Sequence, residues 1–496
     1  MIRRGDLRRR IIPRWRGIDD AIDPADRGDH SKLADIRGDV IEREQAWLEA
    51  DKHSRGLALD LITVASTARD PSVVTREAAH WLLEDGQISA LVRRVASGLL
   101  APPPAQPTLD LVSTNDPVDQ ESIALRVKYL RRALHADPRN ALAWAEQARM
   151  YVLIGQAEPA RRAMKRAVEM APNHRFLLRA ASRLSIHLDE PERAQAILLS
   201  SPRTRSDPWL MAAEIAVSSF TDRPSRQITV ARDLLAHGAW TCRDITELAS
   251  AVGTVDLEAG KEKRARNLFR ISLEDPNENS LAQAEWAAPK VGGMQSRLQP
   301  AMLNTPQSFE AHSRAAAAAA DHAKAVEHGW LWLLDQPFST QPAWFGSYHA
   351  ALTRDFNRSL EFARRGLQAN PDDPTLLNNA AFALAQADHP DQAMRSVAQV
   401  KDRDKLSPGQ QATLLATEGL IAFRSGNPTR GEAIYLEAID LAADPITRAL
   451  ALIMLASEMV RSRTFGVDGV LRRASEQGTK HLPKQDHAWL DFLRPK

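Results

Sequence analysis

The residue types that catalyse reactions are present in this chain, but their spacings do not suit catalysis. The 14 histidines are scattered, and the six-residue separation of His322 and His328 does not place two metal ligands on one helical face. The single cysteine, Cys242, could be made reactive by Arg243, but a lone cysteine is more often inert packing. The sequence has no Gly-rich phosphate loop, no His-Glu-x-x-His, no Cys-x-x-Cys and no Gly-x-Ser-x-Gly. We therefore expect no enzymatic activity, no metal site and no cofactor.

Binding chemistry is suggested first by an arginine-rich segment before Gly17. As a nucleic-acid arm it would neutralise phosphates, with Trp15 available to stack on a base. As a structural element it would dock Ile11, Ile12 and Trp15 against the first helices and leave the arginines in water. An acidic partner surface is a third interpretation, and the interleaved apolar residues favour docking. The candidate arm residues are Arg8, Arg9, Arg10, Arg14 and Arg16.

Length and composition limit the fold classes that this chain can adopt. A chain of 496 residues is too long for one ordinary core, so it forms several domains or a solenoid. Apolar residues make up 44% and charged residues 26%, which argues against disorder, and the net charge of +2 argues against a whole-surface affinity for nucleic acid or membrane. We find no export signal and no apolar window of about 18 residues that would span a membrane. A cytoplasmic location is expected.

The organisation of the chain follows from composition and helical periodicity. A run containing Pro102, Pro103, Pro104 and Pro107 cannot continue a helix and is the clearest predicted domain boundary. The predicted regions are an Arg-rich arm and irregular segment (1–37), an N-terminal helical region (38–100), a Pro-rich linker (101–118), a first repeat block (119–291), an irregular loop (292–305), a second repeat block (306–445) and C-terminal capping helices (446–496).

One unit of about 34 residues, from Ala141 to His174, has a specific pattern of large and small residues. The distance from Pro306 to Pro374 is twice this length, which supports a true repeat. The pattern of the unit comprises Trp144, Gln147, Ala148, Tyr151, Gly155, Ala160, Met164, Ala167 and Pro172. It resembles the tetratricopeptide repeat (TPR). The resemblance implies an all-α, right-handed α-solenoid of tandem helix-turn-helix repeats, here preceded by a small helical N-terminal region.

One repeat departs from the pattern, because Gly329 stands where a bulky residue is expected and Trp332 where a small one is expected. In one interpretation the interface is repacked, with Trp330 or Trp332 filling the space beside Gly329. In the other, exposed aromatic residues form a hot spot for a partner. The candidate hot-spot residues are Trp330, Trp332, Trp344 and Phe345.

The resemblance also implies which residues line a binding groove. In TPR proteins these are chiefly the second, fifth, ninth, twelfth and thirteenth positions of the first helix of each unit. These positions include Arg149 in one unit, and Arg179, Arg183 and His187 in the next. Guanidinium groups converging there would suit an acidic peptide. The alternative is that arginine is simply frequent in this chain and solvates an exposed face.

Asn378 and Asn379 occupy the fifth and sixth places of a later unit. Each could bond a peptide backbone or serve its own helix turn. Together these features predict a non-catalytic scaffold, cytoplasmic and bacterial, that binds a peptide or partner protein in its groove. The alternative is a nucleic-acid-associated regulatory subunit of a nuclease or bacterial conflict system, with the Arg-rich segment contacting nucleic acid.

Overall fold

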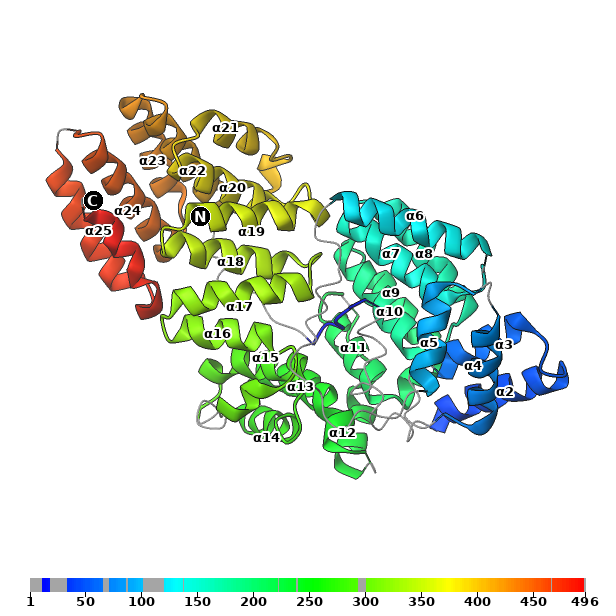
Figure 1. The fold of residues 1–496 in the computed structure, drawn as a ribbon. Helices are drawn as coiled ribbons and strands as arrows, with labels where there is room; N and C mark the ends of the chain where they lie inside the picture. The colour runs from blue at the N-terminus through cyan, green and yellow to red at the C-terminus, as the bar shows by residue number, and fades with distance from the viewer. Residues whose placement is uncertain are drawn as a thin grey trace. The chain divides into compact units, whose positions relative to one another are not determined.

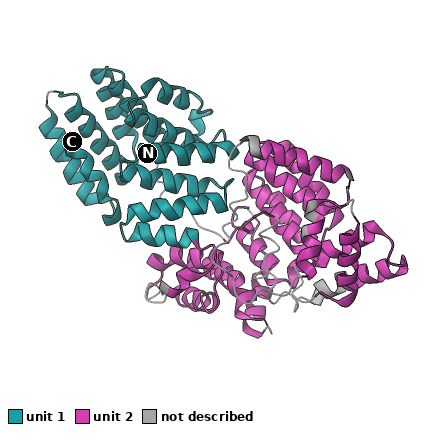
Figure 2. Ribbon diagram, in the orientation of Figure 1, with its two compact units in different colours: residues 1–7, 309–496 teal, residues 8–308 magenta. Residues whose placement is uncertain are grey.

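The computed structural model describes residues 11–17, 34–65, 71–85, 88–100, 120–136, 138–221, 223–237, 240–292, 300–464 and 466–494. Within these ranges every regular element is a helix (Figure 1). The predicted linker 101–118 lies outside the described residues. The chain divides into two compact units, of which unit 2 spans Arg8–Ser308 and unit 1 contains Phe309–Lys496 (Figure 2). The boundary between the two units falls between Ser308 and Phe309.

Unit 2 consists of helices that pack in sequential pairs. Its first helices are α2 (Ala34–Glu49), α3 (Arg55–Ala65), α4 (Val73–Glu84) and α5 (Ala90–Leu100). The repeats that follow contain α6 (Gln120–Ala136), α7 (Ala141–Leu153), α8 (Ala157–Met170), α9 (Arg175–His187), α10 (Pro191–Ser200), α11 (Pro208–Ser218), α12 (Ile228–His237), α13 (Cys242–Glu258), α14 (Glu262–Ser272) and α15 (Glu278–Ala287). The short 3₁₀ helices η2 (Pro202–Arg205), η3 (Ala288–Lys290) and η5 (Pro300–Asn304) lie between or after them.

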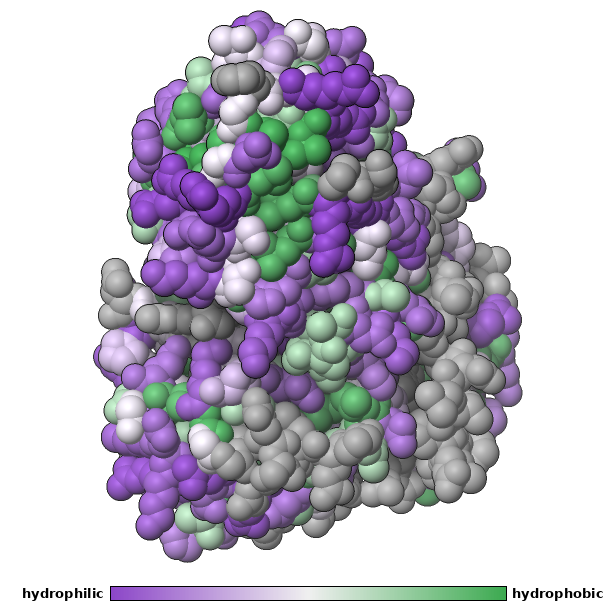
Figure 3. All heavy atoms as spheres, turned by 90° about the vertical axis from the view of Figure 1, so that its left-hand side faces the viewer, coloured by the Kyte–Doolittle hydropathy of each residue, from purple (hydrophilic) through white to green (hydrophobic). Residues whose placement is uncertain are grey.

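Unit 1 continues the same alternation. Its helices are α16 (Phe309–Ala318), α17 (His322–Asp335), α18 (Thr340–Leu352), α19 (Phe356–Ala369), α20 (Pro374–Gln386), α21 (Pro390–Ala398), α22 (Pro408–Arg424), α23 (Pro428–Leu441), α24 (Pro445–Arg461) and α25 (Val467–His481). Two 3₁₀ helices, η6 (Arg403–Lys405) and η7 (Lys484–Leu493), complete it. Half-buried apolar side chains of α24 and α25, such as Leu450 and Leu471, adjoin the core, and Figure 3 shows an apolar strip on the side that carries these helices.

The helices repeat with the period that the sequence predicts. In unit 2, the step from the start of α7 to the start of α9 equals the step from α8 to α10. In unit 1, the same step separates α17, α19 and α21, and it also separates α18, α20 and α22. The turns repeat as well, because Ala320, Arg354 and Asp388 are spaced by this step and all adopt a positive φ of about 60°. A backbone feature that recurs at this interval shows a true structural repeat.

Capping residues and small side chains explain why these segments form closely packed helices. The side chains of Asn140, Asp207 and Asp373 accept backbone N–H groups at the starts of α7, α11 and α20. Ala148 of α7 and Ala160 of α8 are completely buried, so the two backbones approach closely. The first helices of successive pairs, α7, α9, α11, α13 and α15, also pack on one another in order. We call these five helices the first-helix layer of unit 2.

Helices α2–α5 belong to unit 2 and contact its repeats. The side chain of Arg139, just before α7, packs against Gly56 of α3, and its guanidinium lies 4.0 Å from the carboxylate of Asp60. His174, the N-cap of α9, hydrogen-bonds to the backbone of Thr63. These contacts explain why the compact unit includes the helices that precede the proline-rich segment.

Candidate functional site

A short non-helical segment packs against the first-helix layer of unit 2. Residues 11–17, called the strap below, have no regular secondary structure and run beside α11 in dark blue in Figure 1. Ile11 and Trp15 are each 1% exposed. Ile11 belongs to a buried apolar cluster that includes Met211 of α11 and Leu248 of α13. Docking of Ile11, Ile12 and Trp15 against the first helices of the chain was expected, but Ile11 packs on α11 and α13 instead.

A carboxylate of α15 binds the basic residues of the strap. Nη1 of Arg16 lies 2.8 Å from Oε1 of Glu278, and both side chains are 13% exposed. Burial alone would raise the pKa of Glu278, but Arg16, Arg14 and Arg243 outweigh burial and hold this pKa at about 2. Glu278 is therefore ionised at neutral pH, and its charge is balanced largely by the strap.

A second carboxylate links three helices of the layer to the backbone of the strap. Glu247 of α13 is 2% exposed and accepts hydrogen bonds from Arg179 at 2.9 Å, Asn277 at 3.0 Å and Asn279 at 3.1 Å. The same amide nitrogen of Asn279 donates to the carbonyl oxygen of Ile12 at 3.1 Å. A primary amide has two donor hydrogens, so Glu247 orients the group that binds the strap. This network contacts the strap through its backbone, independently of side-chain type.

The arginines predicted to face a common groove have different environments. Arg149 is 1% exposed and is paired with Glu146 one turn earlier on α7, with both nitrogen–oxygen distances at 3.2 Å. Arg179 is paired with Glu247 and lies over the Trp209 ring at 5.2 Å. These pairings correct the prediction of open cationic groups at Arg149 and Arg179, because local carboxylates already neutralise them. The prediction omitted the facing acids.

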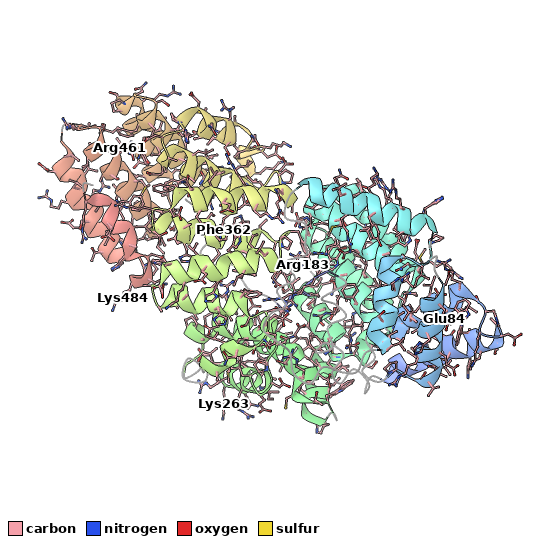
Figure 4. All side chains as sticks on the ribbon, viewed as in Figure 1. Glu84, Arg183, Lys263, Phe362, Arg461 and Lys484 are labelled. Carbon is pink, nitrogen blue, oxygen red and sulfur yellow. The ribbon has the colours of Figure 1, made fainter. Side chains whose placement is uncertain are left out.

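Arg183 and His187 lie one turn apart near the end of α9, and Arg183 is marked in Figure 4. Burial lowers the pKa of Arg183 to about 10. Burial and the nearby Arg183 lower the pKa of His187 to about 3, so this imidazole is neutral at physiological pH. Arg183 therefore stays charged beside a neutral histidine.

The two asparagines of α20 are completely buried. Nδ2 of Asn379 donates to Oγ of Ser347 in α18 at 2.8 Å, so this residue joins two first helices of unit 1. Among the residues that the structure describes, neither polar atom of the Asn378 side chain has a hydrogen-bond partner, and Oδ1 of Asn379 also has none. Asn379 thus has a packing role, whereas Asn378 has unsatisfied donors and acceptors at the fifth position of its helix.

The aromatic residues predicted as a hot spot are distributed through the packing of unit 1. Trp332 is 1% exposed and packs edge-to-face on Phe345, and the space beside Gly329 is taken by the Phe345 ring. Trp330 is half-buried between Arg358 and the ring of Phe362, which Figure 4 marks. Trp344 is half-buried and bonds Asp373. The prediction of an exposed aromatic patch therefore needs correction, and it is Phe345, not a tryptophan, that fills the space beside Gly329.

Of the predicted nucleic-acid arm, Arg8, Arg9 and Arg10 lie outside the described residues. Arg14 and Arg16 are half-buried in the strap beside Glu278. Within the described residues no cluster of three or more histidine, cysteine or acidic side chains could hold a metal ion. No helix in the described ranges is both long and apolar enough to cross a membrane.

We compared the chain with family models, curated proteins and solved structures. No family model and no curated protein matches this sequence. Among solved structures, yeast Tom70 has 13% identity over 74% of this chain and 90% of its own, with a TM-score of 0.30. Human IFIT1, solved as a dimer with PPP-AAAA, has 14% identity over 76% and 94%, with a TM-score of 0.36. Cut9 in the APC/C Cut9–Hcn1 hetero-tetramer has 13% identity over 96% of both chains, with a TM-score of 0.36.

These TM-scores are too low to support an argument, so the assignment depends on the chain's own geometry. Helix pairs that repeat at the TPR interval over α7–α10 and α17–α22, with first helices packed on first helices, decide it. The chain is a TPR-like α-solenoid. Its strap-binding residues, Glu247, Glu278 and Asn279, were not among the sequence predictions. The TPR position rule was applied to the units that begin at Ala141, Arg175 and Pro374, and the same rule was not extended to α13 and α15, which carry these three residues.

Proposed function

We propose that this TPR-like chain is a non-catalytic scaffold, and that α11, α13 and α15 hold a short non-helical segment of a partner protein. The observation that carries the proposal is the strap itself. The layer offers an apolar seat for one side chain, a carboxylate for a guanidinium and an oriented amide for the backbone. These are the components of a peptide-binding surface.

The nucleic-acid alternative is not favoured by the described part of the arm. Arg16 is paired with a buried carboxylate, and the Trp15 ring is 1% exposed. A guanidinium bound to Glu278 is not available to a phosphate, and a buried ring does not stack on a base. The described features of the strap therefore support a peptide function.

The experiment uses the full chain with a weakened strap. Ile11→Asp combined with Trp15→Ala removes both buried strap side chains while leaving α11, α13 and α15 unchanged. A fluorescent, end-capped peptide of residues 11–17 is titrated into this variant, and binding is followed by anisotropy. We expect saturable binding, and at least tenfold weaker binding of a scrambled peptide of the same composition. Circular dichroism verifies that the variant is folded. A folded variant that binds neither peptide would contradict the proposal.

A further inference from the structure

The surface under the strap places specific demands on any segment that replaces it. If the strap leaves, Glu278 loses Arg14 and Arg16, and Arg243 remains as the cation that lowers its pKa. Water can solvate Glu278 while the strap is away, but a segment that covers this carboxylate again without a cation would leave a buried unpaired charge, which is strongly destabilising. An incoming segment must therefore supply a guanidinium at the place of Arg16.

The seat of Ile11 makes a second, apolar demand. It lies in a cluster lined by Met211 and Ile215 of α11 and by Leu248 and Val252 of α13, all at most 1% exposed. Removing Ile11 would expose this apolar surface to water, at a cost that grows with its area. A replacing segment must therefore carry an aliphatic residue about five positions before its arginine, as Ile11 precedes Arg16.

The hydrogen bond from Asn279 to the strap backbone selects the backbone conformation of a segment and does not select its side chains. Asn279 donates to the carbonyl of Ile12, and Glu247 fixes the orientation of this amide. In an α-helix, most carbonyl oxygens accept a hydrogen bond from their own chain. A non-helical segment leaves this oxygen available, which matches the conformation of the strap.

We propose that the strap occupies the partner site in cis, and that the partner is a protein with a non-helical segment of the same chemistry. This segment carries an aliphatic residue, an aromatic residue four positions later and an arginine directly after it. The inference rests on the proposed peptide-binding function. It adds the chemistry of the partner segment and the competition between that segment and the strap for one site. Because the strap is tethered, its effective concentration is on the order of millimolar, so it weakens partner binding to the intact chain.

Charge reversal tests the pairing within full-length chains. In Arg16→Glu the strap is repelled by Glu278, and in Glu278→Arg it is repelled by the new cation. Two labelled peptides of residues 11–17 are used, one with the natural arginine and one with that arginine replaced by glutamate. We expect Arg16→Glu to prefer the natural peptide and Glu278→Arg to prefer the glutamate peptide, each by at least tenfold. The wild-type chain should bind the natural peptide at least tenfold more weakly than Arg16→Glu does.

A chain with both reversals restores the attraction in cis and controls for folding. It should bind both peptides as weakly as the wild type. The competition is overturned if wild type and Arg16→Glu bind the natural peptide equally, and the stated chemistry is overturned if both single variants prefer the same peptide. A dimer formed by strap exchange, measured by light scattering, would overturn the assignment to a partner protein. If no opened chain binds either peptide, the proposed function itself fails.

Discussion

Two segments outside the repeats fold back onto first helices, one in each unit, and they do so by different chemistry. The strap buries Ile11 and Trp15, and it contacts α15 through the Arg16–Glu278 ion pair and a hydrogen bond from the side-chain amide of Asn279 to its backbone. In unit 1, η7 contacts α18 and α20 mainly through rings. Trp489 donates to the Tyr348 hydroxyl at 2.9 Å and packs edge-to-face on Phe382, and it is 1% exposed.

The difference suggests that the two segments have different roles. A large buried ring contributes mainly to stability, and both segments bury one, Trp489 in η7 and Trp15 in the strap. The strap adds the Arg16–Glu278 ion pair, and charge pairs contribute more to specificity and to the rate of association, which is consistent with the proposed exchange. Tyr348 and Phe382 occupy the ninth positions of α18 and α20, which the TPR rule assigns to the groove. In unit 1 the side chains at both positions contact Trp489 of the same chain.

The largest expected effect is the loss of the η7 ring. Trp489→Ala should destabilise unit 1 by about 4 kcal/mol, because it removes a fully buried ring and leaves a cavity. Trp489→Phe is the matched variant, and it should cost about 2 kcal/mol, since it keeps an aromatic side chain and loses the bond to Tyr348. Urea denaturation of the full chain, with hydrogen exchange to locate the change, measures both. If both variants lost the same free energy of unfolding, the Trp489 ring would not be what stabilises η7 on unit 1.

The next effect concerns the carboxylate that organises the layer in unit 2. Glu247→Ala should cost about 3 kcal/mol, because it leaves the Arg179 charge without its carboxylate and removes two amide contacts. The control is Glu169→Ala on α8, where the side chain is 60% exposed and pairs with Lys165 at 3.7 Å. The control should change stability by less than about 0.5 kcal/mol. Similar losses for both substitutions would show that the network contributes no stability.

Acid should destabilise unit 2 through His174. Burial, then Arg203, lower the pKa of His174 to about 3 from its ordinary 6.5. Between these values the unfolded chain binds a proton that the folded chain does not. Keeping His174 neutral therefore costs no stability above pH 6.5. As the pH falls from 6.5 toward 3, the free energy of unfolding decreases by about 1.4 kcal/mol per pH unit. His174→Gln should reduce the difference between urea midpoints at pH 7 and pH 5. An unchanged difference would rule out His174 as its source.

The smallest effects separate the two buried asparagines of α20. Asn379→Ala should cost about 1 kcal/mol, because it removes the hydrogen bond to Ser347. Leucine has nearly the same shape as asparagine, and Asn378→Leu removes polar atoms that have no partner among the described residues, so it should be neutral or stabilising. Thermal unfolding of both variants tests this order. A clear loss on Asn378→Leu would mean that its amide has a stabilising contact.

The repeats were predictable from sequence because their signal is local. Ala148, Tyr151 and Ala160 belong to a pattern of large and small residues that lies within one repeat. That pattern predicted the first residues of α7, α9 and α20. The pairing of charges was not predictable in this way. A position rule places Arg179 on a face of its helix, but Glu247 lies 68 residues away and its approach depends on the packing of α9 against α11 and of α11 against α13.

The strap presented the same difficulty at longer range. Arg16 and Glu278 are separated by 262 positions, and no local pattern joins them. The apolar character of Ile11 and Trp15 predicted that the segment docks, since burying them is favourable wherever a seat exists. Only the folded layer shows which helices provide that seat. The chemistry of the site thus comes from the strap and the helices together.

The most direct test of the central claim follows Trp15 while a competing peptide is added. The full chain is prepared with 5-fluorotryptophan, and the Trp15 signal is assigned by its absence in Trp15→Phe. Because Trp15 is 1% exposed, its fluorine resonance before peptide is added should have the chemical shift of a buried tryptophan. Saturating unlabelled peptide of residues 11–17 should move it to the shift of the free peptide, because the strap is displaced. Peptide binding that leaves the Trp15 resonance at its buried shift would contradict competition for one site.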